Sequence, residues 1–142
     1  MGTKLHAQWV VGFVDGEGCF HIEHNGKYFL PSFTVVQHSS NVQILYALKE
    51  MFGVGVVRKN TKTCMCWRVR SQNHLLNVII PFFNKHPLKT SKNVDFKKFA
   101  YALTLMQRKE HLTPEGAEKI LRLKVSMNKK NLDHEKIESD LT

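Results

Sequence analysis

The sequence predicts an α+β fold in which helices accompany one four-stranded antiparallel sheet. Apolar residues recur at helical spacing in some segments and alternate with polar residues in others. The alternating segments come as two adjacent pairs, and a short turn joins the members of each pair, as in antiparallel hairpins. The predicted order of elements is αββαββαα, and 142 residues are enough for one domain with a hydrophobic core.

The first predicted helix, at residues 5–17, carries small residues along one face. Gln8, Gly12 and Gly16 fall at four-residue spacing, and glycines four residues apart let a second helix approach almost to backbone contact. We expect Gly18 to end the helix in the left-handed conformation. An amphipathic core helix with an ordinary glycine cap has the same pattern, so the pattern alone leaves both interpretations open.

Two carboxylates, those of Asp15 and Glu17, fall at the C-terminal end of this helix. The helix dipole disfavours negative charge there by roughly 0.3–1 kcal/mol for each group. The last backbone carbonyls of a helix also lack partners within it. Acidic side chains beside such carbonyls are explained if the helix end binds a divalent cation.

The elements that follow end at recognisable turn residues. Asn25-Gly26 is a strong hairpin signal between strands at 19–24 and 28–37, and Pro31 favours an edge or bulged position in the second strand. The turn residues Ser39-Ser40-Asn41 supply N-cap candidates for the next helix. The later elements are a helix at 41–52 ending at Gly53, strands at 54–60 and 64–71, a short apolar helix at 75–83, a long helix at 93–110, and a last helix from Thr113-Pro114-Glu115 to about Met127.

Alternation along the strands divides their residues between two faces of the sheet. Large apolar side chains such as Phe20, Phe33 and Trp67 fall on the inward face. The outward face carries residue types that can bind base edges in the major groove of DNA. These outward residues are His21, Glu23, Asn25, Ser32, Thr34, Arg58, Asn60, Lys62, Cys66, Arg68 and Arg70. A solvated antiparallel face would look similar.

The chain is strongly basic, with 21 Lys and Arg against 12 Asp and Glu, a net charge of +9 and a pI of about 9.6. Residues 131–142 hold four of the acids and one Lys, so residues 1–130 carry 20 basic and 8 acidic residues, a net +12. This charge favours a polyanionic partner, with nucleic acid first, although a soluble basic protein can have the same composition. We expect one folded domain at 1–130 and an acidic tail at 131–142.

Other features narrow the class of protein. Cys19, Cys64 and Cys66 form neither an even disulfide set nor a CxxC pair, which favours reduced thiols in an intracellular compartment. The sequence contains no run of 18 apolar residues and no signal or transit peptide. We therefore expect no association with a membrane.

Residues Val10 to Gly18, VVGFVDGEG, resemble the LAGLIDADG signature of homing endonucleases and their relatives. The resemblance continues beyond this motif. The basic connector of the family is similar to His86-Pro87-Leu88, Thr90, Lys92 and Asp95-Phe96, and its C-terminal helices are similar to Lys109–Gly116, Ile120 and Ser126-Met127-Asn128. The match covers about residues 5–130 and includes one LAGLIDADG motif, the number typical of homodimeric members.

The resemblance implies the αββαββαα fold of the family and a homodimeric, site-specific DNA endonuclease that cuts both strands of a long pseudo-palindromic target. The Glu17 carboxylate and the Gly16 carbonyl would bind Mg²⁺ as the cofactor. The dimer would form where the faces that hold Gln8, Gly12 and Gly16 pack together.

Three further residues match positions of the family's active site. Gln37 matches the polar residue that orients the attacking water, although it could instead cap the turn that follows it. Lys92 and Lys89 match the basic residue near the scissile phosphate, where positive charge stabilises the transition state. Either lysine could instead make a nonspecific phosphate contact.

The resemblance also implies an intron-encoded protein of a mitochondrion or chloroplast. Two alternatives use the same fold: an RNA-splicing intron maturase, whose partner would be RNA, and a DNA-binding regulator that does not cut. Intact Glu17, Gln37 and Lys92 favour the nuclease, because a protein that only binds nucleic acid does not need them.

Overall fold

A computed structural model of the chain describes residues 4–128. The chain divides into two compact units, residues 1–90 and 91–142, and each is considered by itself. The elements of the first unit are α1 (Ala7–Glu17), β1 (Gly18–Asn25), β2 (Tyr28–His38), α2 (Val42–Phe52), β3 (Val56–Lys59), β4 (Cys64–Val69), α3 (Gln72–His74) and α4 (Ile80–Lys85), and those of the second are α5 (Lys92–Gln107) and α6 (Pro114–Ser126). The predicted acidic tail lies outside the described residues.

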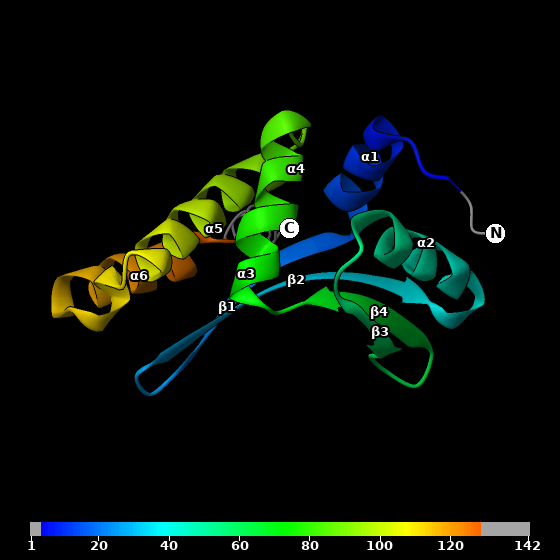
Figure 1. Cartoon of the computed structure of the whole chain (residues 1–142). Coiled ribbons are helices and arrows are strands. Elements are labelled where there is room, and N and C mark those ends of the chain that lie inside the picture. The colour runs from blue at the N-terminus through cyan, green and yellow to red at the C-terminus, as the bar shows by residue number, and fades with distance from the viewer. Residues whose placement is uncertain (1–3, 129–142) are drawn as a thin grey trace, which may run out of the picture. The chain divides into compact units, whose positions relative to one another are not determined.

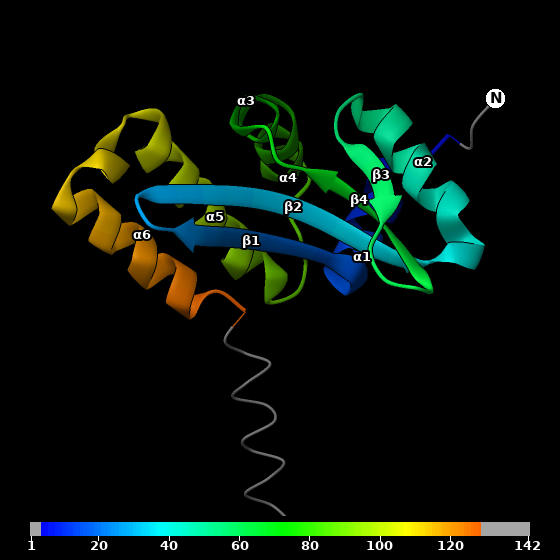
Figure 2. The same cartoon turned by 90° about the horizontal axis from the view of Figure 1, so that it is seen from below.

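The first unit is a sheet with helices on one face. The strands form one four-stranded antiparallel sheet in the order β1-β2-β4-β3, which confirms the predicted sheet and the α+β class. Helices α1, α2 and α3–α4 lie above the sheet in Figure 1, and the view from below shows the strands in front of them (Figure 2). Within residues 4–90, the opposite face of the sheet has no helical cover.

The helical content after β4 is larger than the order αββαββαα states. The apolar helix predicted at 75–83 belongs to a helical run from Gln72 to Lys85. Three helical segments therefore follow β4 in the described chain, in agreement with the three predicted helices, although the order αββαββαα counts only two. A π-helical turn, Leu75–Ile79, lies within this run. Leu75, Ile79 and Phe83 are buried along it, which explains why apolar residues dominate this stretch.

Strand β2 is central in the sheet along only part of its length. It pairs with β4 from Phe33 to His38, whereas Pro31 pairs only with Ile22 of β1. Proline therefore lies where β2 is locally an edge, as its missing amide requires. The predicted β1–β2 turn is also confirmed, because Asn25 pairs with Tyr28 and Gly26 between them has φ +59°.

Aromatic rings fill the space between the sheet and its helices. Phe20, Phe33 and Trp67 have no solvent exposure. The Phe20 and Phe33 rings stack with centroids 4.9 Å apart, and Trp67 meets Phe33 edge-on at 5.6 Å. The Trp67 indole NH donates to the Val54 carbonyl at 3.0 Å, so its one polar group is paired. The predicted inward face of the strands is therefore confirmed.

Helix α1 passes into β1 without a loop, and the expected left-handed conformation of Gly18 is wrong. Gly18 is extended, with φ −83° and ψ 158°, and is already the first residue of β1. A Cβ atom there would lie 2.7 Å from Val14 Cγ1 and 3.4 Å from Phe33 Cε1. Glycine is therefore required for close packing at this junction and not for a positive φ.

The predicted C-terminal end of α2 is confirmed, whereas the predicted N-terminal cap is wrong. Gly53 ends the helix with φ +72°, and its amide donates to the Lys49 carbonyl. At the other end Asn41 makes no side-chain cap, because Ser39–Asn41 forms a 3₁₀ turn instead. His38 caps that turn, and its Nδ1 accepts from the Ser40 amide at 3.2 Å.

The second unit is a pair of helices joined by a tight turn. The Thr113 hydroxyl accepts from the Gly116 amide at 3.0 Å and caps α6, and Pro114 is its first residue, as predicted. At the far end of α6, Asp95 Oδ1 accepts from the Asn128 amide at 3.0 Å. Val94, near the start of α5, is 53% exposed.

Within residues 4–128, no helix is both long enough and apolar enough to cross a membrane.

The clearest test of sheet packing is at Gly55, which has φ +90°. A Cβ atom there would lie 2.5 Å from Trp67 Nε1 and 2.8 Å from the Arg68 carbonyl oxygen. Gly55→Ala should lower the free energy of unfolding by about 1–2 kcal/mol from left-handed strain and by a further ~1–3 kcal/mol from overpacking. Gly53→Ala is the matched control, because φ is +72° and no atom lies within 4 Å. Equal losses for the two variants in urea unfolding would contradict this packing.

Candidate active site and nucleic-acid interface

The predicted small-residue face of α1 is exposed. Gln8, Gly12 and Gly16 are all solvent-accessible, and a Cβ atom added at either glycine would meet nothing within 4 Å. Val10, Val11 and Val14 occupy the buried side of the same helix. The described chain therefore leaves this face open to a second helix, and the identity of that helix remains a prediction.

The Glu17 carboxylate stands at the exposed C-terminal end of α1. Glu17 is the last residue of the helix, and no basic residue lies in the last turn. Among the described residues, none forms an ion pair with Glu17. An exposed anion therefore lies beside the carbonyl end of the helix dipole, where a cation would be stabilised.

The Asp15 carboxylate has a different role, because the connector after α4 binds it. The Lys89 amide donates to Asp15 Oδ2 at 2.9 Å. The amide and the hydroxyl of Thr90 donate to Asp15 Oδ1 at 3.2 and 2.7 Å. These three hydrogen bonds hold Lys89 and Thr90 against helix α1, although the two residues follow Asp15 by 74 and 75 positions in the sequence. Asp15 therefore fixes the basic connector, a role that local sequence pattern did not reveal.

The other predicted active-site residues fall into two places. Leu88 is buried and Lys89 is exposed, so the connector is anchored with this lysine at the surface of the first unit. Lys92 is the first residue of α5 in the second unit.

Gln37 lies near the α1–β1 junction. Val35 pairs with Gly18, and Gln37 follows two residues later on the same face of β2. The alternative that Gln37 caps the next turn is wrong, since the side chain of His38 makes that hydrogen bond with Ser40. Gln37 therefore remains a candidate for ordering a small ligand at this end of the sheet.

The donor atoms at this end of α1 suit a hard divalent cation, but one copy supplies few of them. Described residues contain no cluster of three or more His, Cys, Asp or Glu that could hold a metal ion. With Asp15 engaged by the connector, Glu17 and the helix-end carbonyls are the oxygen donors available there. Mg²⁺ is typically bound by one or two carboxylates, with water and phosphate oxygens completing its shell. The donor set fits that pattern.

The uncovered face of the sheet forms an open groove of about 430 Å³, here called the sheet groove. Six of the predicted DNA-binding residues line it: His21, Glu23, Ser32, Thr34, Arg68 and Arg70. Four other residues complete the lining: Cys19, Leu30, Pro31 and Val36. Alternation places Cys19, Leu30 and Val36 on this face, although the predicted DNA-binding set did not include them.

One predicted member of this surface needs correction. Cys66 pairs with Val36 and Arg58, so it faces the predicted side of the sheet, but its side chain is fully buried. Its neighbours cover the small thiol, and a direct contact with DNA is therefore not possible without rearrangement. Alternation gives the side on which a residue lies, but it does not give the residue's exposure.

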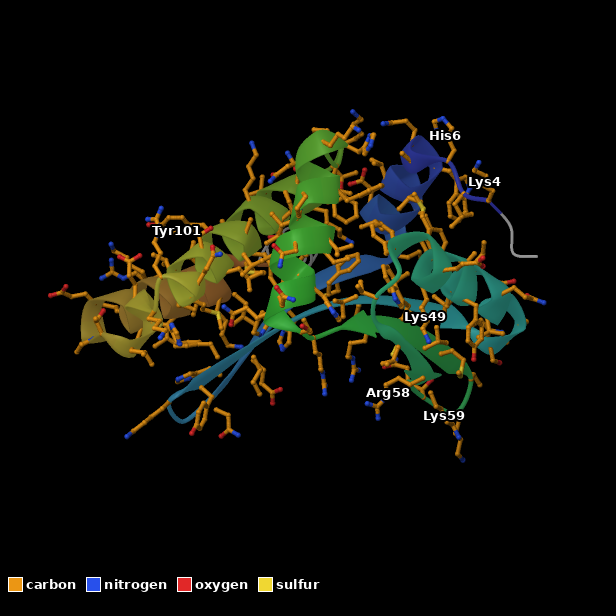
Figure 3. All side chains as sticks on the ribbon, viewed as in Figure 1. Lys4, His6, Lys49, Arg58, Lys59 and Tyr101 are labelled. Carbon is orange, nitrogen blue, oxygen red and sulfur yellow. The ribbon has the colours of Figure 1, made fainter. Side chains whose placement is uncertain are left out.

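The remaining predicted residues lie beyond the sheet groove. Asn25 is at the β1–β2 turn, while Asn60 and Lys62 are exposed in the β3–β4 turn. Arg58 and Lys59 extend from β3 at the lower edge of the sheet (Figure 3). Lys59 adds a positive charge that alternation had assigned to the other face. These positions extend the basic surface at the β3–β4 end.

Comparisons with known proteins agree with this geometry. The family model described as LAGLIDADG endonuclease matches residues 10–103. "Probable intron-encoded endonuclease 2" of Neurospora crassa is 37% identical over 121 residues, which are 84% of this chain and 26% of that protein. "Probable intron-encoded endonuclease Cox1-I1b" of Schizosaccharomyces pombe is 37% identical over 106 residues, which are 70% of this chain and 27% of that protein. The chain thus spans about a quarter of these relatives.

Solved structures share the fold over most of the chain. A crystal structure of the homing endonuclease I-TnaI has a TM-score of 0.84 and 50% identity, and the match covers 89% of this chain and 90% of that one. I-SmaMI, bound to an uncleaved DNA target in the presence of calcium ions, has a TM-score of 0.84 and 39% identity. That match covers 89% of this chain and 46% of I-SmaMI.

The Asp15 contacts can be tested without any substrate. Asp15→Asn replaces one acceptor oxygen by a donor that faces either the Lys89 amide or the Thr90 amide, so we expect a loss of about 1–3 kcal/mol in unfolding free energy. Amide hydrogen exchange at Lys89 and Thr90 should accelerate. Thr90→Val is the control, because it removes only the hydroxyl contact and should leave the Lys89 amide protected. Unchanged exchange in Asp15→Asn would contradict the anchoring role.

Proposed function

The chain belongs to the LAGLIDADG endonuclease family, and from this premise we propose that it is a homodimeric, site-specific endonuclease that cuts double-stranded DNA. The observation that carries the proposal is the position of Glu17. It is an exposed carboxylate, without an ion-pair partner in the part of the chain that the structure describes, at the end of a helix that leads directly into the sheet carrying Arg68 and Arg70. An intron-encoded, organellar origin is part of the proposal and is supported by the names of the relatives.

The cofactor we propose is Mg²⁺, held by the Glu17 carboxylate and the Gly16 carbonyl. When bound, Mg²⁺ supplies charge neutralisation at the scissile phosphate and lowers the pKa of a coordinated water. The residues of the chain have their own tasks. Glu17 provides the anionic oxygen, and Gln37 orients a water molecule near the helix end by hydrogen bonding.

The basic connector supplies positive charge to the reaction. Lys89 or Lys92 would stabilise the extra negative charge that develops on the phosphate in the transition state. Asp15 holds the backbone of Lys89 through a hydrogen bond of 2.9 Å, so the chain there is fixed before DNA binds. A fixed positive charge costs little reorganisation during the reaction, which is why this anchoring supports catalysis.

A second copy completes the proposed enzyme. The exposed Gln8, Gly12 and Gly16 face allows two α1 helices to pack closely, which would bring two Glu17 carboxylates together at the axis. Each copy would then serve one DNA strand. The two sheet grooves would bind the two halves of a pseudo-palindromic site, as the symmetry of a homodimer requires.

The direct test of the chemistry is Glu17→Gln, which keeps the shape of the side chain and removes its charge. Mg²⁺-dependent DNA cleavage should fall by orders of magnitude, while DNA binding should remain because the sheet groove is unchanged. Cleaved sites are first selected from a randomised DNA library, and binding and cleavage are then measured on the selected duplex. Wild-type binding without any cleavage would instead favour the maturase or the regulator.

The test of assembly is Gly12→Leu. Leucine favours the helix more than glycine does, so folding should be retained, but its side chain would separate two packed α1 helices. Wild type should sediment at twice 16.4 kDa, and the variant should sediment as a monomer without nuclease activity. Lys49→Leu, on the exposed side of α2, is the control and should remain dimeric. A wild-type protein that stays monomeric on DNA would exclude this assembly.

A further inference from the structure

The sheet groove contains apolar side chains among its polar ones. Leu30 and Val36 both line the groove, on the face of the sheet without helical cover. Leu30 is 50% exposed. Neither side chain is needed to fill the core, because the core residues of β2 are Phe29, Phe33 and Val35 on the other face. Exposed Leu30 and partly exposed Val36 thus place apolar groups beside Arg68 and Arg70, and a partner with both anionic and apolar parts would be complementary to them.

The register of the sheet fixes where these groups lie. Thr34 of β2 pairs with Cys19 of β1 and with Arg68 of β4, so these three residues form one row across the groove. Val36 lies one row from Thr34 on the side of the α1–β1 junction. Leu30 lies two rows away on the side of the β1–β2 turn, where it pairs with Glu23. Arg68 therefore lies between the two apolar positions.

The major groove of DNA offers few apolar groups to such a surface. Base pairs present hydrogen-bond donors and acceptors there, and the C5-methyl group of thymine is the apolar exception. An arginine in the same groove matches the two acceptors of guanine. Leu30 and Val36 are thus complementary to thymine methyls on either side of a base that Arg68 contacts.

We propose that Leu30 and Val36 are specificity-determining residues that select thymine at two positions of each half-site by contact with its methyl group. This inference rests on the proposed function and goes beyond it by naming part of the target. Val36 selects the inner thymine, nearer the site of cleavage, and Leu30 selects the outer one. The base preference that depends on Arg68 lies between them.

Strand geometry gives the spacing. A rise of about 3.4 Å per residue puts Thr34 about 7 Å from Val36 and about 14 Å from Leu30. Because base pairs of DNA are about 3.4 Å apart along the axis, these distances correspond to at most about two and four base pairs. The outer thymine is therefore expected about twice as far from the Arg68-dependent base as the inner thymine.

The experiment uses the full chain and one randomised duplex library prepared in two forms. One form contains thymidine, and the other contains deoxyuridine in its place, which removes only the methyl group. Bound duplexes are sequenced for wild type, Leu30→Ser, Val36→Ser and Arg68→Ala. Tyr46→Ser is the matched control, because Tyr46 is an exposed apolar residue on α2, away from the groove.

Wild type should select thymine at two positions per half-site, and the preference at each should weaken about fourfold in the deoxyuridine library, as expected for one buried methyl group. Val36→Ser should lose the inner preference and Leu30→Ser the outer one, whereas Arg68→Ala should change the base between them. Tyr46→Ser should match wild type. The comparison of the two libraries needs only wild type, so it decides the question even if a variant fails to fold.

Three results would overturn the inference, and the third is distinguishable from the first two. Site-specific binding with identical preferences in the two libraries would exclude methyl contacts and leave the proposed endonuclease intact. Equal loss of affinity for all sequences in Leu30→Ser and Val36→Ser, without a change in base preference, would also exclude the methyl contacts and leave the proposed endonuclease intact. Absence of any sequence preference in wild type would contradict the proposed function and, with it, this inference.

Discussion

The contact between Gly18 and the side chains of Val14 and Phe33 is the constraint on which the site depends. Because Gly18 has no Cβ, the chain leaves α1 and enters β1 within a single residue. The carboxylate of Glu17 is therefore fixed relative to the sheet groove by covalent connection and not by a flexible loop. The same junction directs the exposed α1 face and the groove to different sides of the unit. One short segment thus links proposed assembly, chemistry and DNA recognition.

A second constraint is that the two acidic residues of the motif, Asp15 and Glu17, have different roles. Asp15 accepts three hydrogen bonds from the connector, whereas Glu17 is exposed and has no ion-pair partner among residues 4–128. Two unpaired carboxylates at the carbonyl end of one helix would repel each other and oppose the dipole. Hydrogen bonds to Asp15 offset part of that cost and also fix the connector. One copy then contributes a single free carboxylate, which accounts for the need that we propose for a second copy.

Much of the fold was predictable because its signals are local. The Asn25-Gly26 turn, the Thr113-Pro114 helix start and the alternation of Phe33 with Thr34 depend on neighbouring residues, and the structure confirms them. The features that were missed depend on contacts distant in sequence. Asp15 meets Thr90, and Cys66 is covered by its cross-strand neighbours. Gly18 is restricted mainly by Val14, four residues earlier, but only because the chain turns straight from helix into strand there. Residue pattern gives a residue's face, but these roles require the packed structure.

The central claim is that two copies of this site act together, with one Glu17 for each DNA strand. Mixed dimers of differently tagged wild-type and Glu17→Gln chains, isolated by both tags, test it on a supercoiled plasmid that carries the selected target. The mixed dimer should produce nicked circles, since one strand retains an intact site. If the two sites act independently of their partners, nicking should proceed at about half the wild-type rate, and if they share both carboxylates, it should be slower. Linear plasmid formed at the wild-type rate would show that one Glu17 is enough to cut both strands.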